Sequence, residues 1–263
     1  MTSDSGALLF YVISIIFGAL IGSFLNVCIC RLPREESIVT PGSHCPQCKN
    51  PIRFYDNIPL LSYVLLKGKC RHCGKPISIQ YPIVEGVTAL SSWVLFTRYG
   101  PSLTYLFFFA FVAALIVITV IDLQHQIIPD VISIPGMVVG LLGSLVLPHL
   151  SFLNSLGGLL LGGGSLFLVA TIYQWLFKRE GMGGGDVKLL GMIGAFLGWK
   201  AVILTILLSS LIGSLIGILV MVLKGKGFKY AIPFGPFLSL GAVLTLFYGE
   251  SIIQWYLYSL PGG

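Results

Sequence analysis

The sequence predicts an all-α membrane protein that crosses the bilayer several times and carries one small polar module. Only 10% of the 263 residues are charged, against roughly 25% in a soluble domain, and the mean hydropathy is +0.93. Several apolar runs are continuous and reach the roughly 20 residues that a transmembrane helix needs. A transmembrane barrel would instead show short segments of alternating polarity, so the spans are predicted to be helices.

Hydropathy divides the chain into about eight spans. No basic segment or small-residue cleavage site accompanies the first span, so we expect a retained helix rather than a cleaved signal. The sixth span is short and is separated from the seventh only by Trp199-Lys200. The predicted spans are 7–29, 82–98, 102–121, 131–148, 153–177, 187–199, 201–223 and 232–258. The predicted domains are a first transmembrane helix (1–30), a polar module (31–80) and a transmembrane domain of about seven helices (81–263).

The basic residues predict how the spans are oriented. If the polar module is cytoplasmic, alternation of eight spans places all of the 16 lysines and arginines except Arg98 and Lys200 on the cytoplasmic side. Such a bias matches the positive-inside rule and predicts that both termini lie outside. Because the basic residues follow the orientation of the spans, the net charge of +6 does not indicate that nucleic acid is a partner.

The polar module contains two Cys-x-x-Cys pairs with 21 residues between them. Two such pairs supply four thiolates, the set that holds a structural zinc ion in zinc ribbons. A cytoplasmic loop lies in a reducing compartment, where disulfides are rare. A segment of about 50 residues has too small an apolar core to be stable without such a cross-link. We therefore expect structural Zn²⁺, with an iron–sulfur cluster or a redox pair as alternatives, on Cys45, Cys48, Cys70 and Cys73.

Two aspartates are the main candidates for chemistry. Asp122 ends the apolar run 104–121, and Asp186 closes the glycine-rich segment 181–186 before the next span. Ionisable groups at the membrane boundary are costly and usually functional. The predicted orientation brings both aspartates to the cytoplasmic face at similar depth. Two carboxylates that approach each other form an acid/base pair that shares one proton, as a membrane aspartyl protease requires.

Other polar residues near the spans have simpler interpretations. Asp130 begins span four, where an acidic residue stabilises the start of a helix. Glu85 lies one turn inside span two. It has two possible roles there, a polar functional role or stabilisation of the helix end. Gly158 and Gly162 are spaced for helix packing. By contrast, the glycines at 183–185 leave the backbone room for an extended substrate to approach Asp186.

Other chemistries find less support in the sequence. It contains neither the His-Glu-x-x-His of a zinc protease nor a phosphate-binding P-loop. The main alternative is a proton-coupled transporter, because broken, glycine-rich helices with intramembrane acids also describe that class. A zinc-anchored scaffold without chemistry would leave Asp122 and Asp186 unexplained. No internal repeat relates the two halves, and a cytoplasmic zinc module has no evident transport role.

Taken together, the motifs resemble those of the type IV prepilin leader peptidases, membrane aspartyl proteases with a Gly-x-Gly-Asp motif. The resemblance covers nearly the whole chain. It is carried by Gly22-Ser23-Phe24-Leu25-Asn26-Val27, the four-cysteine module, Tyr81-Pro82-Ile83-Val84-Glu85, the segment from Asp122 to Ile128-Pro129-Asp130, and that from Gly181 to Asp186-Val187-Lys188-Leu189.

The resemblance implies a bifunctional enzyme of the bacterial inner membrane, with Asp122 and Asp186 as the catalytic pair. Such an enzyme removes a short basic leader from prepilins or pseudopilins of type IV pili or type II secretion. It then methylates the new N-terminal residue with S-adenosylmethionine. For methyl transfer we select Gly68, Lys69 and Glu85 as candidates. A prepilin's leader is cationic and its next segment is an apolar helix, so its scissile bond would lie at the inner membrane boundary.

Overall fold

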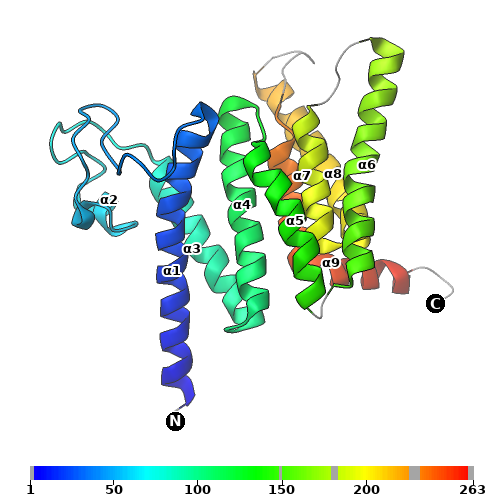
Figure 1. Ribbon diagram of the computed structural model, residues 1–263, viewed down its shortest axis with the longest axis horizontal. Coiled ribbons are helices and arrows are strands. Elements are labelled where there is room, and N and C mark those ends of the chain that lie inside the picture. Colours follow the sequence, from blue (N-terminus) through cyan, green and yellow to red (C-terminus); the bar gives the residue numbers. More distant parts are fainter. Residues whose placement is uncertain (1–2, 148–149, 179–182, 225–231, 260–263) are drawn as a thin grey trace. The chain divides into compact units, whose positions relative to one another are not determined.

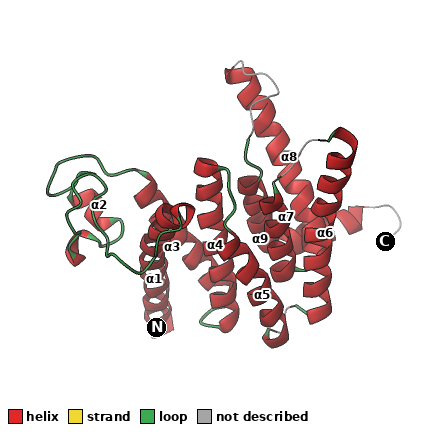
Figure 2. Ribbon diagram, turned by 45° about the horizontal axis from the view of Figure 1, so that its top comes forward, coloured by secondary structure: helices red, strands yellow, loops and turns green. Residues whose placement is uncertain are grey.

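The computed structural model describes residues 3–147, 150–178, 183–224 and 232–259. Within these ranges every regular element is a helix, apart from two isolated β-bridges in the polar module (Figure 2). The predicted all-α class is therefore confirmed. The chain forms two compact units, Met1–Val117 and Ile118–Gly263, which are described separately below.

The first unit contains two helices that pack along each other and the polar module that connects them in sequence (Figure 1). These helices are α1 (Ser3–Arg31) and α3 (Gln80–Tyr99). The module holds the short helix α2 (Leu61–Leu65) and the 3₁₀ turns Leu32–Arg34 and Phe54–Asp56. The helix α4 (Leu103–His125) begins in this unit and ends in the second.

Small residues let α1 and α3 approach closely. A Cβ added at Gly22 would lie 2.7 Å from the Cα of Glu85, and one at Gly18 would lie 2.7 Å from the Cα of Ala89. Polar side chains then join the two backbones. The Ser92 hydroxyl donates to the Ser14 carbonyl at 2.6 Å. Contacts of this kind, between small and hydroxyl-bearing residues, are typical of helices that associate within a bilayer.

The second unit is a bundle of helices around α7 (Gly184–Leu197). Every residue of α7 from Leu189 to Phe196 is buried, as expected for a helix that is apolar on all sides. The surrounding helices are α5 (Asp130–Val146), α6 (Phe152–Phe177), α8 (Trp199–Lys224) and α9 (Gly235–Ser259). On α6, Gly158 packs against the backbone of Gly194 and Gly162 packs against the backbone of Leu190, both in α7. The packing role predicted for these two glycines is confirmed.

The boundary between α7 and α8 differs from the predicted one. We expected the break at Trp199-Lys200, but α7 ends at Leu197 and α8 already begins at Trp199. Gly198 makes the break, with φ +83°, a backbone conformation that favours glycine. Its N–H donates to the Gly194 carbonyl at 2.8 Å and so closes the C-terminus of α7.

Each predicted span corresponds to a helix, but not every helix has the length and hydropathy of a membrane span. Within the described residues, five helical segments meet both conditions. The helix α5 is apolar but has only 17 residues, and α7 has 14. A 14-residue helix is about 21 Å long, short of the roughly 30 Å hydrocarbon core. The five segments are Leu8–Arg34, Leu103–His125, Phe152–Phe177, Trp199–Leu223 and Gly235–Tyr256.

Candidate active site and metal centre

Asp122 lies in the last turns of α4 and is buried, with 5% of its surface exposed. Its Oδ2 accepts a hydrogen bond of 3.0 Å from the backbone N–H of Gly235, the first residue of α9. A Cβ at position 235 would lie 2.6 Å from that oxygen, so only glycine allows the close approach. The sequence analysis did not identify Gly235, because the contact joins residues 113 positions apart.

Asp186 lies in the first turn of α7 and is partly exposed. Its neighbour Gly185 packs against Ile128, and an added Cβ there would lie 2.8 Å from the Ile128 Cβ. The same isoleucine extends its Cδ1 to within 3.2 Å of a Cβ built on Gly235. Ile128 therefore contacts Gly185, which adjoins Asp186, and Gly235, whose N–H binds the Asp122 carboxylate.

The glycines before Asp186 differ in their surroundings. A Cβ at Gly184 would meet no atom within 4 Å, and one at Gly183 would approach only Asp186 Oδ2 and Gly185 N, each at 4.0 Å. Gly185, by contrast, is packed. The space at 183 and 184 is open, and the predicted approach of a substrate backbone there stays a prediction. Gly181 and Met182 of the predicted motif lie outside the described residues.

Asp130 does more than begin a helix. It occupies the first turn of α5, as expected, but both of its carboxylate oxygens accept hydrogen bonds of 2.7 Å from the Lys188 ammonium. Lys188 follows Asp186 by two residues on α7. The ion pair therefore joins the start of α5 to the start of α7, two residues after Asp186, a connection that the sequence analysis missed.

The four cysteines of the module form one cluster. Their sulfur atoms all lie within 4.8 Å of one another, and Cys45 Sγ is 3.9 Å from Cys73 Sγ. Tetrahedral zinc with bonds of about 2.3 Å places its sulfur ligands about 3.8 Å apart, so the donor set fits this metal. The Cys48 backbone N–H lowers the pKa of Cys45, whereas desolvation and the other cysteines raise the pKa of Cys48.

The two cysteine pairs form equivalent knuckles, a repeat that the sequence analysis overlooked. Both segments read Cys-x-x-Cys-x-x-Pro-Ile, which is the signal that could have revealed it. In the first knuckle Cys45 N–H donates to Asn50 O, and in the second Cys70 N–H donates to Lys75 O, each at 2.9 Å. The residue after each pair has positive φ, +61° at Lys49 and +67° at Gly74.

An ion pair supports the module beside the second knuckle. The guanidinium of Arg71 donates three hydrogen bonds to the Asp56 carboxylate, the shortest of 2.6 Å. These bonds lower the pKa of Asp56 below its usual value. Arg71 also lies over the Tyr55 ring, with its Cζ 5.6 Å from the ring centroid. Together these contacts connect the knuckle to the 3₁₀ turn Phe54–Asp56.

The candidates for methyl transfer lie in structural contacts. Glu85 is buried on α3 and accepts a 2.7 Å hydrogen bond from the Leu60 N–H. Gly68 has φ +65°, and a Cβ there would lie 3.1 Å from the Tyr63 ring. Lys69 is exposed and pairs with Pro76 through an isolated β-bridge. Glu85 thus anchors the module to α3, while Gly68 and Lys69 shape the second knuckle.

Comparisons with known protein families cover most of the chain. Residues 16–99 match the model of the bacterial peptidase A24 N-terminal domain, and residues 109–218 match that of the type IV leader peptidase family. A prepilin leader peptidase/N-methyltransferase of Aeromonas hydrophila is 37% identical, over 95% of this chain and 94% of its own length. The chain belongs to the type IV leader peptidase family.

Further relatives carry the same name. The protein of that name from Pseudomonas aeruginosa is 36% identical over 96% of this chain and 95% of its own length. Another, from Myxococcus xanthus, is 39% identical over 74% of this chain and 58% of its own. No solved structure matches the chain. None of these relatives is named a transporter, so the transporter interpretation finds no support.

Proposed function

We propose that this protein removes the leader of prepilins or pseudopilins with Asp122 and Asp186, and then methylates the new N-terminus. The main support is the arrangement around Ile128. This residue contacts Gly235, whose N–H binds the Asp122 carboxylate, and Gly185, which adjoins Asp186. Two acids in one bundle, with open backbone space at Gly184, form the arrangement that an aspartyl protease needs.

The two aspartates differ in a way that suggests their roles. A backbone N–H stabilises a carboxylate over a carboxylic acid, so we assign the ionised base to Asp122, which accepts the Gly235 N–H. Asp186 then holds the shared proton. Asp122 would take a proton from water while the water oxygen bonds to the scissile carbonyl carbon and Asp186 protonates the carbonyl oxygen. Collapse of this intermediate breaks the C–N bond: the leaving amine receives the proton from Asp122, and one hydroxyl of the intermediate returns its proton to Asp186 as the carbonyl re-forms.

We propose that the four-cysteine cluster binds Zn²⁺ and that the ion is structural. All four ligand positions would be filled by thiolates, which leaves none for a reacting water. The matched knuckles and the Arg71–Asp56 pair surround the site with structural contacts. The ion would hold the module together, as expected for a segment with little apolar core.

For methyl transfer we propose S-adenosylmethionine as the donor of the methyl group. The family names of the relatives support the activity, while Gly68, Lys69 and Glu85 remain candidates without a geometry that assigns them. Glu85 is the best placed to affect the reaction indirectly, because its bond to Leu60 fixes the module on α3. We derive no chemical step from these three residues.

We further propose that the chain lies in the bacterial inner membrane with eight spans, with both termini outside and the module and aspartates facing the cytoplasm. The lysine and arginine distribution supports this orientation. The leader of a prepilin is basic and its mature segment is apolar, so its scissile bond would meet the aspartates at the inner boundary. In this proposal, residues 81–263 form the transmembrane catalytic domain.

The intact mass of a model prepilin tests both activities. The substrate carries a basic leader and a Gly–Phe junction and is incubated with purified protein, with and without S-adenosylmethionine. We expect loss of the leader in both reactions and one added methyl group only with the donor. Asp122→Asn and Asp186→Asn should each reduce cleavage to background.

Glu250→Gln provides the matched control, because it removes an exposed carboxylate in the C-terminal half of α9, 15 residues after Gly235. It should leave cleavage unchanged. Cleavage by folded Asp122→Asn or Asp186→Asn protein at the wild-type rate would contradict the assigned pair. Cleavage without methylation would retain the protease and reject the methyltransferase.

A further inference from the structure

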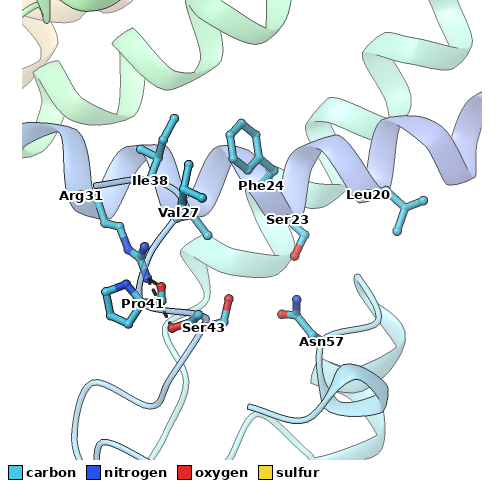
Figure 3. A pocket seen from close by; sticks show the side chains of 11 residues that line it. Leu20, Ser23, Phe24, Val27, Arg31, Ile38, Pro41, Ser43 and Asn57 are labelled. Atoms are coloured by element: carbon cyan, nitrogen blue, oxygen red, sulfur yellow. Dashed lines mark hydrogen bonds between the residues drawn. The ribbon is translucent and has the colours of Figure 1, made fainter. Parts of the chain in front are cut away.

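A pocket in the first unit lies between α1 and the loops of the cysteine module (Figure 3). It has a volume of about 270 Å³. Its wall on α1 is formed by Leu20, Ser23, Phe24 and Val27, followed by Arg31 at the end of the helix. Ser43 and Asn57 face them from the module. Three of the four residues that precede Arg31 on this wall are therefore apolar, and Arg31 supplies a cation at the end of the wall.

Arg31 is a buried cation without an anionic partner. Only 9% of its surface is exposed. Its guanidinium donates to three backbone carbonyls, those of Ser37 at 2.8 Å, Pro41 at 2.6 Å and Gly42 at 3.4 Å. Neither salt bridge in the described part of the chain involves it. Burial of a charge is unfavourable unless it is paired, so this site favours an anion.

The length of the pocket corresponds to one leaflet of a bilayer. Leu20 and Arg31 are separated by 11 residues of helix, or about 16 Å. Half of the hydrocarbon core of a bilayer is about 15 Å. Leu20 and Phe24 are exposed on a helix long and apolar enough to cross the membrane, with 55% and 46% of their surface accessible. An acyl chain would cover them while its headgroup reached Arg31.

We propose that this pocket binds one anionic phospholipid, with its phosphate on Arg31 and part of one acyl chain along Leu20, Phe24 and Val27. A free phosphate would leave the apolar wall uncovered, and a neutral lipid would leave the guanidinium without a counter-charge. The lipid would bridge α1 and the loop at 41–43, and so fix the cysteine module against the membrane helix. This role is independent of the assignment of the aspartates.

Native mass spectrometry of the full-length protein, released from detergent with its zinc bound, tests the proposal. The probes are phosphatidylglycerol and phosphatidylcholine with identical acyl chains. We expect the first phosphatidylglycerol to bind about tenfold more tightly than phosphatidylcholine, the effect of one charge-assisted contact. Arg31→Gln should remove this preference. Arg34→Gln, which changes an exposed arginine three residues later, should preserve it.

Because Arg31 also holds the loop carbonyls, Arg31→Gln could disturb the module. Val27→Trp is a second variant that fills the pocket and leaves Arg31 in place. It should weaken binding of both lipids while the zinc content stays normal. Equal binding of the two lipids to the wild type, or unchanged binding after Val27→Trp, would overturn the proposal. Displacement of phosphatidylglycerol by S-adenosylmethionine, dependent on Arg31, would assign the pocket to the methyl donor instead.

Discussion

The Asp122 Oδ2 accepts a hydrogen bond of 3.0 Å from the N–H of Gly235, the first residue of α9. This bond joins the end of one helix to the beginning of another, so the position of the acid depends on both. The first N–H groups of a helix have no partner within the helix and carry its positive dipole end. A carboxylate placed there is stabilised in its ionised form, which suits the proposed general base.

Gly235→Ala should therefore impair cleavage strongly. The new Cβ would lie 2.6 Å from Asp122 Oδ2 and 3.2 Å from Ile128 Cδ1, so the carboxylate must move. We expect a loss of at least about tenfold in kcat, because small misplacements of catalytic groups are costly. Cleavage of a model prepilin provides the measurement. Gly217→Ala, in α8 with no atom within 4 Å of the new Cβ, should leave the rate unchanged.

The Lys188–Asp130 ion pair should position Asp186 without adding much stability. Its two side chains are 38% and 55% exposed, and exposed pairs contribute roughly 0–1 kcal/mol. We expect Lys188→Gln and Asp130→Asn each to lower kcat several-fold, with small changes in KM and thermal stability. The double exchange Asp130→Lys with Lys188→Asp should restore part of the rate. Failure of the exchange together with a large loss of stability would indicate a purely structural pair.

The parts of this protein that sequence reasoning could predict depend on local patterns. Apolar runs predicted the helices, and the spacing of Cys45, Cys48, Cys70 and Cys73 predicted their cluster, because each knuckle forms within a few residues. Contacts between distant segments left no comparable signal. Lys188 meets Asp130 across 58 positions and Gly235 meets Asp122 across 113, and nothing in their local sequence indicates these partners. The break at Gly198 was misplaced because one residue with positive φ suffices to end α7.

Loss of one cysteine ligand should remove zinc and loosen the module. Cys70→Ser is expected to abolish the one bound Zn²⁺ per chain, since thiolates supply all four ligands of the proposed site. Elemental analysis measures the metal, and limited proteolysis within residues 31–80 measures the loss of order. Cys30→Ser, which changes an exposed cysteine outside the cluster, should retain both. Normal zinc content after Cys70→Ser would show that the cluster is not the metal site.

Contact between α6 and α7 should be the most sensitive packing feature of the second unit. A Cβ at Gly194 would overlap the backbone carbonyl of Gly158 and lie 2.9 Å from Val202 Cγ2. Backbone atoms cannot yield as a flexible side chain does, so we expect Gly194→Ala to destabilise the protein by about 3 kcal/mol, the upper end for overpacked cores. Thermal unfolding in detergent measures the loss. Gly164→Ala, on α6 with open space around the new Cβ, should be neutral or slightly stabilising. Equal unfolding temperatures for the two variants would mean that α6 and α7 do not meet at these glycines.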